Sequence, residues 1–434
     1  MSSSNNLLVN KSNPFVGTIH IPGDKSISHR SVILGSLSNG HLSVKNFLNS
    51  DDCLCTVSAM QQLGAKIIVD KSSLSIEGLG LTRLKEPTNI IDAGNSGTLM
   101  RLLTGVLAIQ NYNTEITGDS SLRRRPMKRI IDPLRECGAN ILSDNYKAPL
   151  KINGNINLKP INYKQKIASA QIKSCLMLAS LFIDGTSYFH ESVTTRDHTE
   201  NMLEHFNYKI TRSLKGTTIV GRQTLTAKDI VIGSDISSAA FFIVAALISE
   251  GSKITLPNIN INKYRDGIIH VLKKMGANIK IYNKRLESNE LIGDLDVTSS
   301  KLKSIILDGN VISTLIDELP ILFIACSVAT GLSKISGIEE LRHKESDRIK
   351  SMEKGLRAVG INVSSSNDSI EIEGNEISGG KINSFGDHRI AMSFAVAGLI
   401  SKKSITITDT KNICTSFPTF VDIMREQGAE VYEI

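Results

Sequence analysis

The chain has 434 residues, of which 41% are hydrophobic and 21% are charged, and this composition excludes a disordered or fibrous protein. One hydrophobic core rarely supports such a length, so we expect two domains of about 200 residues each. The formal net charge of +7 favours acidic partners, but Lys and Arg gather only at residues 123–129 and Trp is absent, so we expect small anions and not nucleic acid.

The cysteines and the N-terminus give no signal for a metal site, export or a membrane. The six cysteines are scattered, and we expect buried, reduced thiols. Cys53 and Cys55 could form a metal or redox site, but no further Cys or His cluster accompanies them. Residues 1–6 lack the layout of a secretion signal, and no apolar stretch reaches the roughly 18 residues that a bilayer requires. We therefore expect a cytoplasmic protein without a membrane anchor.

One pattern recurs along the chain, in which a helix ends at a glycine and a strand follows. Glycine, or asparagine in its place, lets a helix stop in a left-handed turn. In chain order the copies read MQQLGAKI, LRECGANI, LEHFNYKI, LKKMGANI, GLRAVGINV and MREQGAEV. Their marker positions lie roughly 68 to 84 residues apart and are Gly64, Gly138, Asn207, Gly276, Gly360 and Gly428. This spacing predicts six similar units.

A second series, out of phase with the first, predicts strongly apolar helices. They start roughly 68 to 80 residues apart, near Ser26, Gly97, Ser169, Ser237, Asp317 and His388. Segments such as SSAAFFIVAALIS are apolar on nearly every face, which is typical of buried helices. Each unit therefore has one inner helix, one outer helix and several strands, which makes an α/β fold.

Three units in each half predict two similar lobes. We expect boundaries near Pro22-Gly23 and at Gly233–Asp235, with an N-terminal lobe of residues 23–235 and a C-terminal lobe of residues 1–22 plus 236–434. Residues 11–23 would then pack with the C-terminal lobe to complete its third unit. A cleft between two such lobes would be able to close on a ligand.

Charged and small residues stand immediately ahead of four inner helices. They occur in the segments GDKSISHR, AGNSGTLMR, DEL and GDHR. A helix N-terminus has free N–H groups and a partial positive charge, both of which favour a bound anion. If several such ends face one place, that place binds anions. The alternative is a repeat scaffold whose inner helices merely fill the core, and it does not account for these segments.

Nine short motifs follow one another over nearly the whole chain. They are GDKSISHR from Gly23, GNSGTLMR from Gly94, GDSSLRRRPM from Gly118, SAQIKS from Ser169, TRDHTE from Thr195, DELP from Asp317, LRHKESDR from Leu341, GDHRIAM from Gly386 and TSFP from Thr415. In this order they resemble the signature set of the 5-enolpyruvylshikimate-3-phosphate synthase (EPSP synthase) family.

This resemblance implies both a reaction and a fold. The reaction transfers the enolpyruvyl group of phosphoenolpyruvate to the 5-hydroxyl of shikimate 3-phosphate and releases phosphate, in the biosynthesis of chorismate and aromatic amino acids. The fold has two similar lobes, each of three βαβαββ repeats with buried parallel helices, as in the inside-out α/β barrel of enolpyruvyl transferases. No cofactor or metal is implied, and the chain has no motif for either.

The resemblance also implies which residues bind the two substrates, each of which carries a carboxylate and a phosphate. A planar guanidinium pairs with either group through two hydrogen bonds, which makes arginine apt. The implied phosphoenolpyruvate clamp is Arg125 for the phosphate, with Arg348 and Arg389 for the carboxylate. The residues implied to hold shikimate 3-phosphate are Lys25, Ser26, Arg30, Ser169, Ala170, Gln171 and Arg196, and of these Lys25 and Gln171 also reach phosphoenolpyruvate.

Two differently tuned proton-transfer groups are needed, since the 5-hydroxyl loses a proton while C3 of phosphoenolpyruvate gains one. By resemblance, Asp317 accepts the proton of the hydroxyl and Glu345 protonates C3. Lys25 stabilises developing charge or shares proton transfer, and Lys344 orients the shikimate hydroxyl. Asp317 could also be a plain helix N-cap. For His388 we expect a hydrogen bond at the helix start and not a catalytic role.

Two positions depart from the pattern of relatives, and a third differs between branches. Thr415 stands where some relatives have a Lys, so we assign no phosphate contact there. Ala170 stands where many have a second Ser, which removes a side-chain donor and leaves the backbone N–H. A branch with similar motifs can carry Ala in place of Gly97, so we expect a roomier phosphoenolpyruvate pocket here and inhibition by the competitor glyphosate.

Two other interpretations stay open. UDP-N-acetylglucosamine enolpyruvyl transferases resemble the chain in fold and donor, but their loop carries a reactive Cys that the segment GDSSLRRRPM lacks. A non-catalytic repeat protein that clamps nucleic acid would not place Asp317 and Glu345 among its basic residues, because carboxylates repel a phosphate backbone. We expect a monomer.

Overall fold

The computed structural model describes residues 6–434, which form two compact units. The N-terminal unit consists of Gly23–Gly233 and Leu286–Glu290, and the C-terminal unit consists of residues 6–22, Ser234–Arg285 and Leu291–Ile434. Each unit has a hydrophobic core of its own. Among residues 6–434, no helix combines the length and apolar character needed to cross a membrane.

Each unit contains three four-stranded sheets with one repeated topology. An edge strand runs parallel to the second strand, which pairs antiparallel with the third. In the N-terminal unit the sheets are β14(Ile230–Val231)-β3(Asn39–Lys45)-β5(Ser73–Leu79)-β4(Lys66–Asp70), β6(Ile91–Asp92)-β7(Asn113–Thr117)-β9(Lys147–Asn153)-β8(Asn140–Asp144) and β10(Asn162–Lys164)-β11(Thr186–His190)-β13(Gly216–Val220)-β12(Ile210–Ser213). In the C-terminal unit they are β16(Asn278–Glu287)-β17(Glu290–Thr298)-β15(Lys253–Asn260)-β2(Val16–Thr18), β18(Ile306–Leu307)-β19(Leu332–Ser336)-β21(Ser369–Glu373)-β20(Val363–Ser365) and β22(Gly380–Asn383)-β23(Ile405–Thr408)-β1(Asn6–Val9)-β24(Val431–Glu433).

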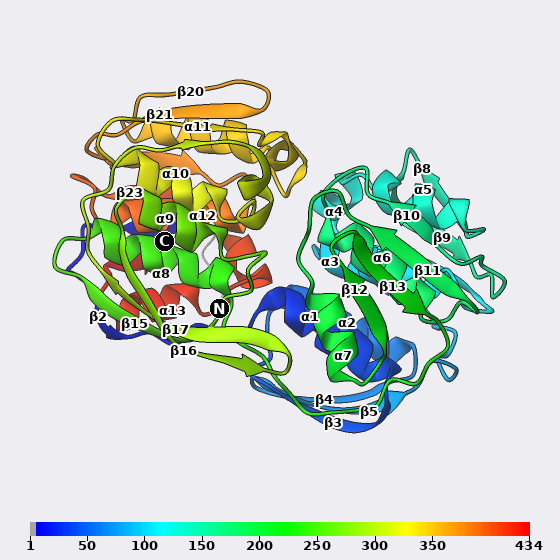
Figure 1. The fold of residues 1–434 in the computed structure, drawn as a ribbon. Coiled ribbons are helices and arrows are strands. Elements are labelled where there is room, and N and C mark those ends of the chain that lie inside the picture. The colour runs from blue at the N-terminus through cyan, green and yellow to red at the C-terminus, as the bar shows by residue number, and fades with distance from the viewer. Residues whose placement is uncertain (1–5) are drawn as a thin grey trace. The chain divides into compact units, whose positions relative to one another are not determined.

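Six inner helices form the centres of the two cores, three in each unit. They are α1(Lys25–Leu37), α3(Gly97–Leu107), α6(Ala170–Ser180), α8(Ile236–Ile248), α10(Leu319–Ser327) and α12(His388–Gly398). Every residue of α10 is buried, because its sequence offers no polar face. The helices α8, α10 and α12 contact one another within the C-terminal unit, as Figure 1 shows.

The outer helices and shorter turns complete the repeats. The outer helices are α2(Asp51–Gln62), α5(Lys128–Glu136), α7(His198–His205), α9(Gly267–Lys274), α11(Arg348–Ala358) and α13(Phe420–Glu426). The shorter elements are α4(Ser120–Arg124) and the 3-10 turns η1(Gly309–Thr314), η2(Glu339–His343) and η3(Lys411–Thr415). All six marker positions of the repeat have positive φ, from 59° at Asn207 to 100° at Gly138. The predicted α/β fold of repeated units with buried inner helices is confirmed.

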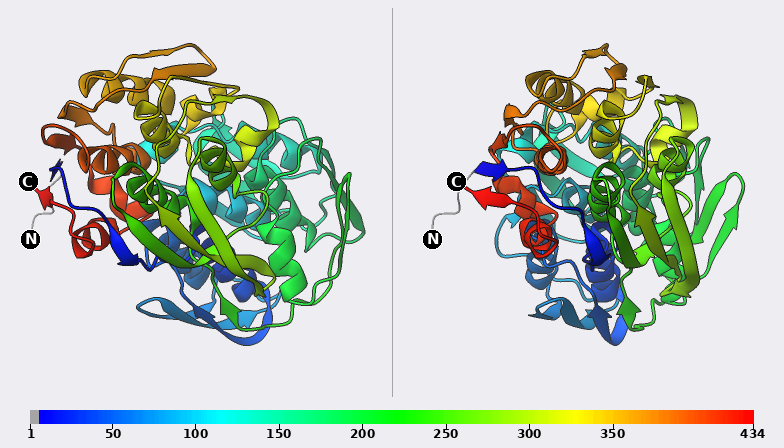
Figure 2. Two further views of the ribbon diagram at one scale, coloured as in Figure 1. Left: turned by 60° about the vertical axis from the view of Figure 1, so that its left-hand side comes forward. Right: turned by 90° about the vertical axis from the view of Figure 1, so that its left-hand side faces the viewer.

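The N-terminal strands belong to sheets of the C-terminal unit. Strand β1 lies between β23 and β24, and β2 forms the parallel edge next to β15. Figure 2 shows the blue strand β1 beside the red strand β24. Strands β1 and β24 thus complete one sheet, and β1 supplies the third strand that this repeat would otherwise lack.

Candidate active site

Helix α1 begins at Lys25 with a cap and an ion pair. Asp24 accepts a hydrogen bond from the backbone N–H three residues further on, at 2.9 Å, and so caps the helix. Lys25 Nζ lies 2.5 Å from Asp52 Oδ2, in the first turn of α2. Ser26 follows in the first turn of α1. This helix start therefore offers a cation and a hydroxyl next to N–H groups that the helix itself leaves unused.

Arg30 is buried one turn further along α1. Its Nε donates to Thr199 Oγ1 at 2.8 Å, and its Nη2 donates to Ser174 Oγ at 2.7 Å. Burial lowers the pKa of Arg30 to about 10, and the positive charge of Arg196 adds to this effect against the opposing charge of Glu200. Arg30 is still a cation at neutral pH. Arg30 and Arg196 are therefore close enough for their positive charges to repel each other.

Gly97 opens helix α3 between two arginines. Ser96 caps the helix through its hydroxyl, which accepts a hydrogen bond at 3.1 Å. A Cβ atom at Gly97 would lie 2.8 Å from Arg101 Nη1 and 3.2 Å from Arg125 Nη1. Arg125 Nη2 donates to Asn95 Oδ1 at 2.7 Å. The missing side chain at Gly97 thus allows both guanidinium groups to approach the helix start.

The start of α6 carries Ser169, Ala170 and Gln171. Ser169 occupies the N-cap position with extended backbone, and its hydroxyl does not cap the helix. The Gln171 amide is held from α3, because Oε1 accepts from Arg101 at 2.6 Å and Nε2 donates to Thr98 Oγ1 at 3.0 Å. The backbone N–H groups of this first turn are further donors.

Arg348 is the centre of the charged cluster in the C-terminal unit, and only 1% of its side chain is exposed. Its Nε donates to Asp387 Oδ2 at 2.8 Å and its Nη2 to Glu345 Oε2 at 2.5 Å, while Asp317 Oδ1 lies 3.8 Å from Nη1. Burial opposes the charge of Arg348, but the attraction of Asp387 and Glu345 outweighs it and raises the pKa. Burial alone would raise the pKa of Asp387, but Arg348 lowers it.

Asp317 and Arg389 lie at the edges of this cluster. Lys344 Nζ is 3.4 Å from Asp317 Oδ1, and Arg389 Nη1 is 4.0 Å from Oε1 of the buried Glu318. Helix α10 begins at Leu319 with Glu318 at the cap position, so the alternative of Asp317 as a helix N-cap is wrong. Asp317 therefore lies next to two cations, Lys344 and Arg348.

The predicted site residues fall into two groups, one in each unit. The structure places Lys25, Ser26, Arg30, Gly97, Arg125, Ser169, Ala170, Gln171 and Arg196 in the N-terminal unit. It places Asp317, Lys344, Glu345, Arg348 and Arg389 in the C-terminal unit. The first group supplies cations and helix N-termini, which bind oxyanions. The second combines carboxylates with cations, which is what proton transfer next to an anion requires.

Sequence reasoning missed several partners of these residues. Asp52 pairs with Lys25, Arg101 holds Gln171, and Asp387 holds Arg348. Arg101 and Asp387 belong to the motifs GNSGTLMR and GDHRIAM, but no role was predicted for either residue. Asp387 also accepts a hydrogen bond from the backbone N–H two residues on, at 2.9 Å, and so provides the cap at the start of α12.

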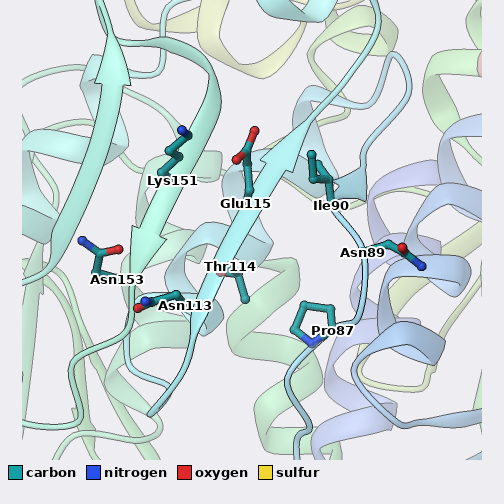
Figure 3. Close-up of a pocket in the computed structure, with 8 residues that line it drawn as sticks. All are labelled: Pro87, Asn89, Ile90, Asn113, Thr114, Glu115, Lys151 and Asn153. Atoms are coloured by element: carbon teal, nitrogen blue, oxygen red, sulfur yellow. The ribbon is translucent and has the colours of Figure 1, made fainter.

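The cysteines and one pocket supply none of the predicted site residues. Cys53 is buried, and burial raises its pKa to about 12. Within residues 6–434, no group of three or more His, Cys, Asp or Glu residues is arranged to hold a metal ion. A pocket in the N-terminal unit contains none of the predicted site residues and is lined by Pro87, Asn89, Ile90, Asn113, Thr114, Glu115, Lys151 and Asn153. Figure 3 shows Glu115 and Lys151 on neighbouring strands of its wall.

Comparison with known proteins gives matches over nearly the full length of the chain. Residues 9–424 match the family described as EPSP synthase (3-phosphoshikimate 1-carboxyvinyltransferase). The 3-phosphoshikimate 1-carboxyvinyltransferase of Coxiella burnetii (strain CbuK_Q154) is 47% identical over 417 residues, which cover 96% of this chain and 95% of that protein. The protein of the same name from Legionella pneumophila (strain Corby) is 46% identical over 407 residues, which cover 93% of this chain and 94% of that protein.

Solved structures show the same fold. An EPSP synthase from Acinetobacter baumannii superimposes with a TM-score of 0.88 at 40% identity, covering 98% of this chain and 99% of that chain. An enolpyruvyl transferase from Streptomyces tendae superimposes with a TM-score of 0.80 at 14% identity, covering 99% of each chain, and at this identity the likeness concerns the fold alone.

Proposed function

Because the chain belongs to the EPSP synthase family, we propose that the two groups of residues described above bind the substrates of that family's reaction and transfer its protons. The enzyme transfers the enolpyruvyl group of phosphoenolpyruvate to the 5-hydroxyl of shikimate 3-phosphate, and it releases phosphate. This reaction is a step in the biosynthesis of chorismate and aromatic amino acids. The observation that carries the assignment of roles is the cluster of Asp317, Lys344, Glu345 and Arg348.

We propose that the N-terminal group holds shikimate 3-phosphate. Its phosphate accepts hydrogen bonds from Ser169, from the N–H groups at the start of α6, and from Gln171. Arg196 adds a charge-assisted hydrogen bond to the phosphate. Lys25, Ser26 and Arg30 hold the rest of the molecule from the start of α1. The burial of Arg30 and its fixed hydroxyl partners support this proposal, because they orient the guanidinium before the substrate binds.

Phosphoenolpyruvate is bound by arginines in this proposal. In the N-terminal unit, Arg125 pairs with its phosphate, with Lys25 and Gln171 also in reach. In the C-terminal unit, Arg348 and Arg389 pair with its carboxylate. Arg348 already donates to Glu345, so an incoming carboxylate replaces Glu345 on that guanidinium.

This replacement gives Glu345 a reason to carry a proton. A carboxylate that loses its cationic partner holds a proton more readily. Glu345 then donates that proton to C3 of phosphoenolpyruvate, while the 5-hydroxyl attacks C2 and gives its proton to Asp317. The product is a tetrahedral intermediate. Its collapse returns a proton from C3 to Glu345 and expels phosphate, which takes up the proton that Asp317 had accepted, and this leaves the enolpyruvyl ether.

Two cations assist these steps. Lys344, 3.4 Å from Asp317, pairs with that carboxylate and orients the shikimate hydroxyl. Lys25 stabilises the negative charge that develops on the substrates. Its ion pair with Asp52 holds the ammonium group at the start of α1.

A coupled assay tests the reaction directly. Purified enzyme is given phosphoenolpyruvate with either shikimate 3-phosphate or UDP-N-acetylglucosamine, and released phosphate is measured. We expect turnover with shikimate 3-phosphate. Turnover with the nucleotide sugar alone would overturn the assignment. Glyphosate is expected to compete with phosphoenolpyruvate, and the cytoplasmic location and monomeric state stay predictions.

A further inference from the structure

A buried ionic cluster in the N-terminal unit has none of the roles proposed above. Lys173, on α6, has its Nζ 3.0 Å from Glu191 Oε2 and 2.7 Å from Glu200 Oε1. The side chains are 3%, 10% and 2% exposed, respectively. Burial alone would lower the pKa of Lys173, but the two carboxylates outweigh it and raise the pKa. Lys173 is therefore a buried cation shared by two anions.

The cluster holds both ends of the loop that carries Arg196. Glu191 directly follows β11 at the start of this loop, and Glu200 lies in the first turn of α7 at its end. The other oxygen of Glu191, Oε1, accepts hydrogen bonds from the N–H and hydroxyl of Thr195 at 3.0 and 2.6 Å. The residue that precedes Arg196 is thus connected to Lys173 through one carboxylate.

Lys173 also connects this loop to the start of α6. Its backbone N–H donates to Ser169 O at 3.3 Å, one turn earlier. A second link runs beside it, because the Thr199 hydroxyl donates to Ser174 Oγ at 2.7 Å and Arg30 donates to both hydroxyls. The three segments that we propose to hold shikimate 3-phosphate therefore meet at one buried network.

The energetics of such a network favour a role in geometry. A buried ion pair adds little net stability over apolar side chains, because desolvation offsets the attraction. Lys173 with Glu191 and Glu200 leaves one negative charge in excess, and the charge of Glu200 also acts on the buried Arg30. Both carboxylates contact Lys173, and Glu191 also accepts hydrogen bonds from Thr195, so the network holds these members in one arrangement.

We propose that Lys173 is a positioning residue that fixes the Arg196 loop against the start of α6 and so sets the phosphate site for shikimate 3-phosphate. The proposal rests on the proposed substrate-binding roles of Arg196 and of Ser169 to Gln171. A site that is ordered before the phosphate arrives loses less conformational freedom on binding. The cluster of Lys173, Glu191 and Glu200 therefore contributes to affinity for one substrate and not to the chemical step.

The test replaces Lys173 by methionine, which keeps the length of the side chain and removes its charge. We expect the KM for shikimate 3-phosphate to rise at least tenfold and up to about 100-fold. The KM for phosphoenolpyruvate and kcat at saturating shikimate 3-phosphate should change less than about threefold. Calorimetric titration with shikimate 3-phosphate alone should show the same loss of affinity.

A second variant guards against loss of the fold. Lys173→Met combined with Glu200→Gln removes one charge of each sign, so it should recover melting temperature without recovering affinity for shikimate 3-phosphate. The control is Lys66→Met, which breaks an exposed ion pair with Glu77 and should leave both KM values unchanged. Recovery of affinity together with melting temperature in the double variant would show a merely structural role and overturn the proposal.

A third variant separates this inference from the proposed function. Arg196→Ala should itself raise the KM for shikimate 3-phosphate, and adding Lys173→Met to it should cost less than the sum of the two single effects. If Arg196→Ala raises the KM for shikimate 3-phosphate and Lys173→Met does not, the proposed positioning role of Lys173 is wrong and the substrate assignment stands. If Arg196→Ala has no effect, the role of Arg196 is wrong, and with it the proposal that Lys173 acts through this loop.

Discussion

The two units hold their central arginines in opposite ways. In the N-terminal unit, Arg30 donates to the hydroxyls of Thr199 and Ser174, which fix its direction without cancelling its charge. In the C-terminal unit, Arg348 donates to the carboxylates of Asp387 and Glu345, which do cancel it. The first arrangement suits the binding of an anion, and the second suits an exchange of anions in which a proton moves.

The largest effect is expected from Asp317, which belongs to the C-terminal unit and accepts a proton in our proposal. Asp317→Ala should lower kcat by about 10² to 10⁴. Affinity for shikimate 3-phosphate, which the N-terminal unit provides in our proposal, should change little. Steady-state turnover and calorimetric titration with shikimate 3-phosphate measure the two quantities, and circular dichroism checks the fold. Unchanged turnover would overturn the mechanism.

Asp387→Asn should give the next largest effect, on stability. It removes a buried partner of Arg348, and breaking a buried ion pair costs about 3–5 kcal/mol in the free energy of unfolding. The pKa of Asp387 is lower in the folded protein than in the unfolded chain, so its contribution is present above about pH 4 and is lost as the pH falls through the folded pKa.

Urea unfolding of the wild type and Asp387→Asn from pH 7 to pH 3 checks both parts of this prediction. The two unfolding free energies should differ most at neutral pH and approach each other in acid. The matched control is Asp229→Asn, because Asp229 is an exposed carboxylate whose pKa is also lowered, by its hydrogen bonds to Ser43. A difference that stays constant down to pH 3 would contradict a role for the ionised Asp387 carboxylate.

Gly97→Ala tests phosphoenolpyruvate binding in the N-terminal unit, and its expected effect is smaller. The added Cβ atom would lie 2.8 Å from Arg101 Nη1 and 3.2 Å from Arg125 Nη1, so both guanidinium groups must move. We expect the KM for phosphoenolpyruvate to rise about tenfold, as expected for one methyl group in a tight site. Glyphosate should inhibit the variant less than the wild type, and equal inhibition of the two would contradict the roomier pocket predicted at Gly97.

The sequence was sufficient for the repeat and for the types of residue in the site, since both depend on local patterns. Positive φ at all six marker positions follows from glycine or asparagine at a helix end. Partners distant in sequence were not predicted, because Arg348 and Asp387 are 39 residues apart and meet only through the packing of α11 with α12. The alternative of Asp317 as the N-cap was wrong by one residue, because Glu318 holds the cap position and Pro320 is accommodated within the first turn of α10, which begins at Leu319.

The smallest expected effect comes from His29, which should give the N-terminal unit its own dependence of stability on acid pH. His29 is buried, with Nδ1 2.6 Å from Thr56 Oγ1 and Nε2 3.4 Å from Ser96 Oγ, and it so connects α1 with α2 and with the cap of α3. Burial first, and then the charges of Lys25 and Arg30, lower its pKa well below the ordinary value.

Because the folded pKa of His29 is below the unfolded one, the unfolded chain takes up the proton first as the pH falls below about 6.5. Stability should therefore fall in this range by at most about 1.4 kcal/mol per pH unit from this residue. His29→Gln keeps a hydrogen-bonding side chain that does not titrate, so its unfolding free energy should depend less on pH between 6.5 and 5 than that of the wild type, as thermal or urea unfolding measures. Parallel curves would mean that His29 is not held neutral, and the N-terminal unit would then have no acid response from this residue.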